Sequence, residues 1–185
     1  DTIHYAVATE LLHNATLLHD DVADDSPTRR GRPTVMSLLG GRASVLLGDY
    51  WLVKAIDNVL VNKTSSSEVI KVFSRTLADL AEGEILQLQK ADLGDTAEND
   101  YYRIIFNKTA SLFVTSAESA AISVSASAEK MKAVKSYAEY LGIAFQIRDD
   151  IFDYEESPDT GKPVGLDLKE KKITLPLLGA LKNAS

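Results

Sequence analysis

The sequence predicts an all-α protein, an antiparallel bundle of helices, and two observations carry this prediction. All five prolines lie outside residues 34–157, and proline is a residue that interrupts helices. Apolar residues recur at helical spacing in long segments, and no sustained period-two alternation indicates strands. Long helices without interruption, joined by short links, favour a bundle.

The first predicted helix runs from Ile3 to about Ala23. Further helices are expected over residues 43–61, 68–91, 97–123 and 129–156. Residues 62–67 and 93–96 are expected links, and Ser65 with Glu68 is a candidate capping box. Loops 26–33 and 157–165 flank the helical body. The last long helix is expected to bury the stripe Val134, Ala138, Leu141, Phe145 and Phe152.

The composition bounds the class of protein. The 185 residues suit one domain over 1–185, and a net charge of −7 argues against nucleic-acid binding. The absence of cysteine excludes disulfides and thiol catalysis, and it fits a cytoplasmic protein. No apolar run is long enough to span a membrane. Because Asp1 opens the chain within a helical pattern, we expect a trimmed chain.

Two aspartate motifs of the form D-D-x-x-D are the strongest chemical signal. One comprises Asp20, Asp21 and Asp24, and the other comprises Asp149, Asp150 and Asp153. Helical residues four apart share a face, so the first and last aspartates of each motif are expected to point together. These aspartates fall at the same helical spacing as the apolar residues of their helices. They are therefore expected to point toward the bundle interior.

Six aspartates near the interior require a counterion. Buried like charges cost several kcal/mol each by order of magnitude, and a divalent cation removes that cost. Carboxylate oxygens suit Mg²⁺, which binds one or two carboxylates together with substrate phosphates. The motifs therefore predict a phosphate-bearing ligand held through magnesium. Acidic helix ends that face water are the simpler alternative.

Basic segments follow each motif. Arg29, Arg30 and Arg32 lie in a loop bounded by prolines, where guanidinium groups are suited to phosphate oxygens. Lys162 and Lys172 follow the second motif. This layout suits a diphosphate. The pair His19-Asp20 is also compatible with an HD-type metal phosphohydrolase. Such an enzyme needs further histidine ligands, and His4 and His13 are poorly placed for that role.

These residues resemble the trans-isoprenyl diphosphate synthases, or polyprenyl synthetases. The stretch from Leu17 to Asp24, with Arg29 to Pro33, is similar to the family's first aspartate-rich motif. The stretch from Phe145 to Tyr154 resembles the second motif. The remaining similar segments are Leu47-Gly48-Asp49-Tyr50, Glu82-Gly83-Glu84 with Gln87, Lys108 to Leu112, Gly161 to Gly165 and Lys172 to Pro176. The resemblance covers nearly the whole chain and implies a helical bundle of the isoprenoid synthase type.

The resemblance implies a transferase that extends an allylic diphosphate with isopentenyl diphosphate. Magnesium, as three ions with diphosphate, would be bound by Asp20, Asp24 and Asp149, with support from Asp21, Asp150 and Asp153. The allylic diphosphate would be held by Arg29, Lys108, Lys162 and Lys172. Arg30 would face isopentenyl diphosphate, and Thr109 and Gln146 would present oxygens near the allylic cation.

The sequence departs from the family pattern in three places. The upstream Gly-Gly-Lys-x-x-Arg-Pro loop and most C-terminal helices of the family domain are absent. Leu166 and Lys171 stand where the family more often has Asn and Gly, so Lys172 has the better register for phosphate. We therefore expect a chain that lacks both ends of the family domain.

The residues before Asp20 predict the product length. Ala15 and Thr16 are not aromatic, so the channel floor at Ala15, Thr16 and Leu12 is expected to be open. Because a helix rises about 1.5 Å per residue, Ala8 lies roughly 18 Å from Asp20. The open floor favours a long product of about C30 to C40, such as a quinone side-chain precursor.

Alternatives remain within and outside this chemistry. A short-chain farnesyl or geranylgeranyl diphosphate synthase differs only in product length. A class I terpene cyclase usually has another motif in place of the second aspartate motif, so the intact motif here argues against it. A non-catalytic subunit of a heteromeric synthase typically lacks the aspartates, which are all present here. The family is usually dimeric, so a homodimer is expected, and the lipophilic product leaves open a loose association with membranes.

Overall fold

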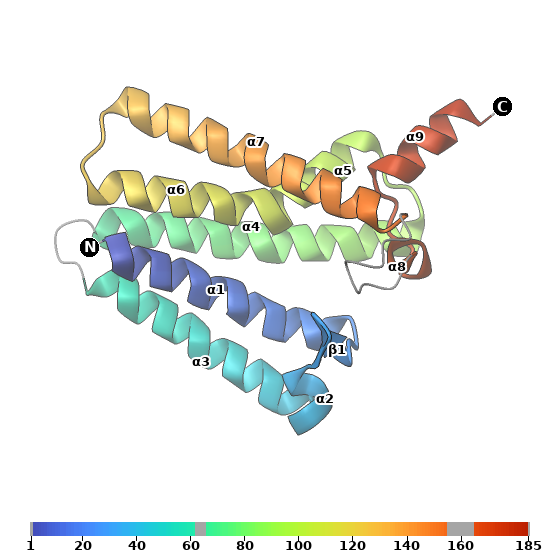
Figure 1. Ribbon diagram of the computed structural model, residues 1–185, viewed down its shortest axis with the longest axis horizontal. Helices are drawn as coiled ribbons and strands as arrows, with labels where there is room; N and C mark the ends of the chain where they lie inside the picture. The colour runs from blue at the N-terminus through green and yellow to red at the C-terminus, as the bar shows by residue number, and fades with distance from the viewer. Residues whose placement is uncertain (1, 62–65, 155–164, 185) are drawn as a thin grey trace. The chain divides into compact units, whose positions relative to one another are not determined.

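A computed structural model describes residues 2–61, 66–154 and 165–184. As predicted, these residues are almost entirely helical (Figure 1). The chain divides into two compact units. Unit 1 comprises Asp1–Val72 and Glu118–Ser127, and unit 2 comprises Phe73–Ala117 and Ala128–Ser185.

Unit 1 is built on two long helices that run antiparallel (Figure 1). Its elements are α1 (Thr2–Ala23), β1 (Thr28–Arg29), β2 (Arg32–Pro33), α2 (Val35–Leu39) and α3 (Gly41–Leu60), with the first turns of α4 (Ser66–Leu93) and the end of α6 (Ser111–Ser123). The predicted helix from Ile3 to Ala23 is confirmed as α1. The two-residue strands and α2 occupy a region that the sequence predicts as loop, because elements this short leave no periodic pattern.

Small and polar residues hold α1 close to α3. Ser44 is fully buried, and its hydroxyl donates a 2.8 Å hydrogen bond to the carbonyl oxygen of Leu18. A β-carbon at Gly48 would lie 2.3 Å from Nε2 of His19, so a larger residue there would displace the His19 ring. The carboxyl end of α1, which bears the first aspartate motif, is thereby fixed against α3.

Unit 2 contains the remaining elements. They are most of α4, α5 (Glu98–Ile105), η1 (Phe106–Ala110), the start of α6, α7 (Ala128–Phe152), α8 (Leu166–Lys169) and α9 (Leu175–Asn183). The predicted helix over 97–123 is therefore found as α5, η1 and α6 in succession. The η1 segment is a π-helical turn, and such turns within helices are frequent at functional sites.

The contact between α7 and η1 is unusually close. A β-carbon added at Gly142 of α7 would lie 2.5 Å from Cα of Ala110 and 2.8 Å from its Cβ. Glycine at this position allows the two backbones to approach. The phase of α7 follows from this contact, because the smallest residues must face η1.

The predicted stripe on α7 is wrong in part. Leu141 and Phe145 are 42% and 53% exposed, whereas Ala138, Gly142 and Asp150 are buried. The close packing at Gly142 turns small residues inward and leaves the larger ones outward. The predicted stripe would bury Asp149. In the structure Asp150 is buried instead, and Asp149 is half-buried.

Two sequence predictions fall on residues that the structure does not describe. The candidate cap Ser65 and most of the loop over 157–165, with Lys162, lie outside the described residues. Among residues 2–61, 66–154 and 165–184, no helix has both the length and the apolar character needed to cross a membrane.

Candidate active site

The first aspartate motif lies at the end of α1 in unit 1. Asp21 is its buried member, whereas Asp20 is half-buried and Asp24 is exposed. Nε of Arg29 donates a 2.7 Å hydrogen bond to Oδ1 of Asp21. The prediction that Asp24 points to the interior is therefore wrong. The buried position belongs to the carboxylate that has an arginine beside it, which offsets the cost of burying its charge.

A short hairpin brings Arg29 to Asp21. In it, Arg29 pairs with Arg32 across the two strands. The turn residues Arg30 and Gly31 have φ values of +52° and +72°, and positive φ at both central positions is typical of tight hairpin turns. The side chain of Arg30 is exposed at the tip. The sequence predicts a stiff arginine loop here, and the hairpin explains its stiffness.

His19 lies against α3. Its Nε2 atom is 3.3 Å from the carbonyl oxygen of Val45 and 3.3 Å from Oδ1 of Asp49. These contacts give His19 a role in joining α1 to α3. They do not favour the HD-type alternative, in which this ring would be a metal ligand.

The π-helical turn η1 in unit 2 carries Lys108 and Thr109. Nζ of Lys108 forms an ion pair with Glu84 and donates a 2.6 Å hydrogen bond to Oε1 of Gln87, both on α4. A β-carbon at Gly83 would lie 3.0 Å from Cγ of Lys108, so this glycine admits the lysine. Glu84 and Gln87 enter the sequence argument only through the resemblance, and the structure shows them as the partners of Lys108.

The second aspartate motif lies at the end of α7. Asp150 is buried, and it accepts hydrogen bonds from the hydroxyl of Tyr101 (2.6 Å) and from Nε2 of Gln146 (2.8 Å). Burial raises the pKa of Asp150, and the two hydrogen bonds oppose this shift. Burial also raises the pKa of Tyr101, and the bond to Asp150 adds to that rise. In both motifs, the second aspartate is thus the buried one, and it accepts hydrogen bonds from side chains of the protein.

Asp153, the last aspartate of the motif, binds the backbone at the start of α8. Its two carboxylate oxygens accept the backbone N–H groups of Leu166 (3.0 Å) and Asp167 (3.1 Å). Burial, with the charges of Asp153 and Asp150, raises the pKa of Asp167 to about 7. Sequence reasoning missed Asp167, because its neighbours come from another part of the chain.

Thr109 and Gln146, which the resemblance places near the substrate, are in contact. The hydroxyl of Thr109 donates a 2.6 Å hydrogen bond to Oε1 of Gln146. The two residues are 37 positions apart in the sequence, on η1 and α7. The close approach of these elements at Gly142 makes the contact possible.

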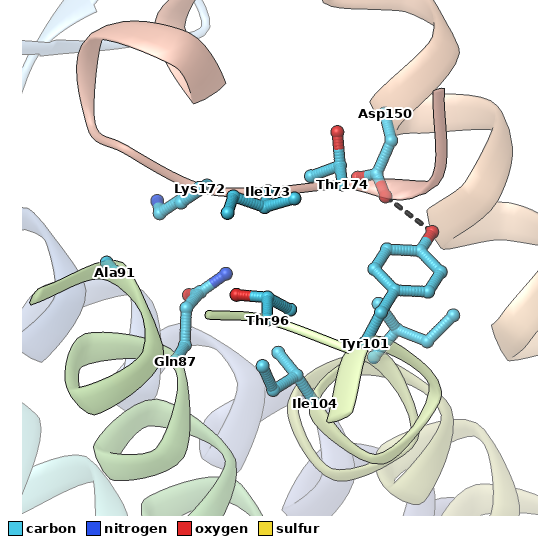
Figure 2. Close-up of a pocket in the computed structure, with 10 residues that line it drawn as sticks. Gln87, Ala91, Thr96, Tyr101, Ile104, Asp150, Lys172, Ile173 and Thr174 are labelled. Atoms are coloured by element: carbon cyan, nitrogen blue, oxygen red, sulfur yellow. Dashed lines mark hydrogen bonds between the residues drawn. The ribbon is translucent and has the colours of Figure 1, made fainter. Parts of the chain in front are cut away.

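A small cavity in unit 2 is lined in part by Tyr101 and Asp150 (Figure 2). Its volume is ≈ 30 Å³, which is room for about one water molecule. Figure 2 shows side chains from α4, α5, α7 and the segment before α9 around it. Its polar lining residues are Gln87, Thr96, Tyr101, Asp150, Lys172 and Thr174. Lys172, the lysine with the better register in the sequence, therefore lies in the same unit as the second motif.

The donor chemistry fits magnesium. Within the part of the chain that the structure describes, no group of three or more His, Cys, Asp or Glu side chains could hold a metal ion. Asp20 and Asp24 in unit 1, and Asp149 in unit 2, are carboxylates on residues that are not buried. Mg²⁺ is usually held by one or two carboxylates, with waters and substrate phosphates as its other ligands.

Comparison with known proteins identifies the family. The chain matches the Polyprenyl synthetase family over residues 1–185. It is 42% identical over 177 residues to the octaprenyl diphosphate synthase of Escherichia coli, covering 95% of this chain and 54% of that protein. A decaprenyl diphosphate synthase structure from Rhodobacter capsulatus aligns with a TM-score of 0.91 and 41% identity, over 99% of this chain and 56% of that one.

A third relative was solved with ligands. The polyprenyl synthase of Caulobacter crescentus, complexed with calcium and isoprenyl diphosphate, aligns with a TM-score of 0.90 and 39% identity. The match covers 97% of this chain and 54% of that one. The chain belongs to the polyprenyl synthetase family, and its fold is the helical fold of these synthases. It spans about half the length of the curated relatives that it matches.

Proposed function

We propose that the protein is a magnesium-dependent prenyltransferase. It condenses an allylic diphosphate with successive isopentenyl diphosphates into an all-trans polyprenyl diphosphate of about C30 to C40. The observation that carries this proposal is that both aspartate motifs are intact in a chain that matches the family over its whole length. Relatives named octaprenyl and decaprenyl diphosphate synthase support the long product.

The reaction begins when the bond between C1 of the allylic substrate and its diphosphate oxygen breaks. The electron pair leaves with the diphosphate, and the double bond of isopentenyl diphosphate attacks the allylic cation. A proton then passes to the released diphosphate, and the product is five carbons longer. Bound magnesium supplies positive charge where the leaving group becomes more negative.

The side chains divide this work. Asp20, Asp24 and Asp149, none of which is buried, bind magnesium. Asp21 accepts a hydrogen bond from Arg29, and Asp150 accepts one from Tyr101. These buried aspartates support the metal-binding members of their motifs. Asp153 supports the site by accepting hydrogen bonds from the backbone at the start of α8, in the segment that leads to Lys172.

Cationic side chains hold the two diphosphates. Lys108, Lys172 and Arg29 bind the allylic diphosphate, and so does Lys162, which lies outside the described residues. Arg30, exposed at the tip of the hairpin, binds isopentenyl diphosphate. Guanidinium groups suit this role because their fixed fork matches two phosphate oxygens. Thr109 and Gln146 place their oxygens near the allylic cation, and the hydrogen bond between them supports this pairing.

The direct test is a product analysis. The full-length protein is incubated with farnesyl diphosphate, labelled isopentenyl diphosphate and Mg²⁺, and the dephosphorylated products are sized by mass spectrometry. A ladder that ends near C30–C40 supports the proposal. Products that stop at about C20 keep the chemistry and favour the short-chain alternative. Absence of elongation contradicts the proposal and favours the non-catalytic subunit.

Ala15→Tyr is expected to shorten the product by at least one five-carbon unit. On the proposal that these residues form the channel floor, a phenol at Ala15 would occupy space that the growing chain needs. Ala15 and Leu12 are fully buried, and Thr16 is half-buried. Product sizing checks the effect. A buried tyrosine also costs about 1–3 kcal/mol where room is lacking, so the melting temperature must be measured in parallel.

The exposed Ala6, also on α1, provides the control for this substitution. Ala6→Tyr puts the same side chain on the outer face of the helix and should leave the product ladder unchanged. A folded Ala15→Tyr variant with the wild-type product distribution would show that these residues are not the channel floor.

We further propose that two copies of the chain associate through α3. Leu46, Tyr50, Val53 and Leu60 are 54–68% exposed, and their spacing places them on one face of the helix. Large apolar patches of this kind are typical of interaction sites. Light scattering of the full-length protein should give the mass of a dimer, and Val53→Glu should shift it toward the monomer. A wild-type monomer at micromolar concentration would contradict the proposal.

A further inference from the structure

Tyr101 is a buried tyrosine outside the two aspartate motifs and the basic segments. It lies on α5, with 2% of its surface exposed, and its hydroxyl donates to Oδ2 of Asp150 at 2.6 Å. Figure 2 shows this bond beside the small cavity. A buried tyrosine hydroxyl usually has a partner. Here that partner is a carboxylate of the second aspartate motif.

The hydrogen bond is the first of three that form a continuous chain. The other oxygen of Asp150, Oδ1, accepts from Nε2 of Gln146 at 2.8 Å. The carbonyl oxygen of Gln146, Oε1, accepts from the hydroxyl of Thr109 at 2.6 Å. The chain therefore runs from Tyr101 through Asp150 and Gln146 to Thr109.

Each link fixes the orientation of the next. An ionised carboxylate only accepts hydrogen bonds, so Gln146 must present its NH₂ group to Asp150. Its carbonyl oxygen then faces Thr109, whose hydroxyl hydrogen is directed to it. The oxygen lone pairs of Thr109 are left for another partner. If Asp150 turned, the amide of Gln146 would be free to rotate and this arrangement would be lost.

We propose that Tyr101 is a positioning residue for the prenyl transfer. By holding Asp150 in one orientation, it fixes the amide of Gln146 and, through that amide, the direction in which Thr109 presents its oxygen to the substrate. The inference rests on the proposed function, because that function gives Gln146 and Thr109 their roles. Residues that orient catalytic groups in this way typically contribute 10–100-fold to activity or metal affinity, by order of magnitude.

Tyr101→Phe tests the proposal in the full-length protein, because it removes one hydroxyl and keeps the buried ring. Its control is Tyr102→Phe, the same change at the adjacent residue, whose ring contacts Tyr101 edge-on and whose side chain is 38% exposed. The measurements are kcat, the KM values of both substrates, the Mg²⁺ concentration for half-maximal rate, and the melting temperature. All rates are measured well below the melting temperature, so that every variant is fully folded.

We expect Tyr101→Phe to lower kcat, or raise the required Mg²⁺ concentration, by about 10–100-fold. The KM for isopentenyl diphosphate should not change, and Tyr102→Phe should behave as wild type. Combination with Asp150→Asn adds a readout that a purely structural role would not move. If Tyr101 acts through Asp150, the double variant should be no slower than Asp150→Asn alone.

Two results would overturn the inference and leave the proposed function in place. One is a Tyr101→Phe enzyme with wild-type kcat and Mg²⁺ dependence. The other is a double variant in which the two losses multiply. A wild-type protein that fails to elongate any substrate overturns the proposed function, and the role of Tyr101 in that reaction with it.

Discussion

Asp20→Asn is expected to lower kcat by about a thousandfold. The change keeps the size of the side chain and removes the negative charge that we propose binds magnesium. The loss of about 4 kcal/mol of transition-state stabilisation corresponds to that factor, since each 1.36 kcal/mol is tenfold in rate. Steady-state assays with farnesyl and isopentenyl diphosphates at saturating Mg²⁺ measure the effect.

Ligand-induced stabilisation separates loss of the metal from loss of the fold. In the wild type, Mg²⁺ with diphosphate should raise the melting temperature, because a ligand at 100 times its Kd stabilises the folded state by about 2.7 kcal/mol. Diphosphate with a chelator should raise it much less. In Asp20→Asn, the melting temperature without ligand should stay near that of the wild type, and the rise with Mg²⁺ and diphosphate should be largely lost.

Asp25→Asn is the matched control. Asp25 follows the first motif, is exposed and has a φ of +48°, a conformation that asparagine adopts readily. This variant should keep the wild-type rate and the wild-type thermal shift. Equal losses in both variants would indicate a general effect of negative charge, and an active Asp20→Asn would contradict the metal assignment.

Gly142→Ala is expected to destabilise the protein by about 1–3 kcal/mol or more. The added methyl group would lie 2.5 Å from Cα of Ala110, which is backbone and cannot rotate away. The higher helix propensity of alanine offsets only about 1 kcal/mol of this cost. For a domain of this size, 1 kcal/mol shifts the melting temperature by about 2–4 °C.

Gly179→Ala provides a control of opposite sign. Gly179 is also within a helix, α9, but nothing lies within 4 Å of where its β-carbon would be. Because no steric clash opposes it, the higher helix propensity of alanine should stabilise the protein by about 0.5–1 kcal/mol. If thermal or denaturant unfolding showed Gly142→Ala to be equally stabilising, the close contact between α7 and η1 would be wrong.

The same contact bears on activity. Because η1 carries Lys108 and Thr109, a methyl group that pushes α7 away from Ala110 should also lengthen the hydrogen bond between Thr109 and Gln146. We therefore expect Gly142→Ala to lose activity even at temperatures where it is folded. Wild-type activity in a folded, destabilised variant would show that η1 tolerates this shift.

Much of the fold could be predicted from the sequence, and so could the residue types on which the proposed chemistry depends. Helix periodicity, with prolines confined to the flanks, predicts α1, α3, α4 and α7 to within a few residues. The two aspartate motifs and the arginine loop indicate a diphosphate and magnesium from residue chemistry alone. These signals are local, because each depends on residues within a few helical turns of one another.

The orientation of helix faces could not be predicted in the same way. The sequence pattern predicts an apolar stripe on α7 through Leu141 and Phe145, but the buried residues are Ala138, Gly142 and Asp150. Hydrophobicity alone does not show where two helices approach so closely that only small residues fit. The same close packing decides which aspartate of the second motif is buried.

The sequence by itself determined the helical class, the two motifs and the residue types available for chemistry, because these properties follow from local spacing and from the side chains themselves. Only the tertiary structure decided the partners. It joined Asp21 to Arg29, Lys108 to Glu84, and Tyr101 to Asp150. The last two contacts link different helical segments across long sequence separations. Gly83 of α4 leaves room for Lys108 beside Glu84, and packing of α5 against α7 brings Tyr101 to Asp150, so that buried polar groups satisfy one another.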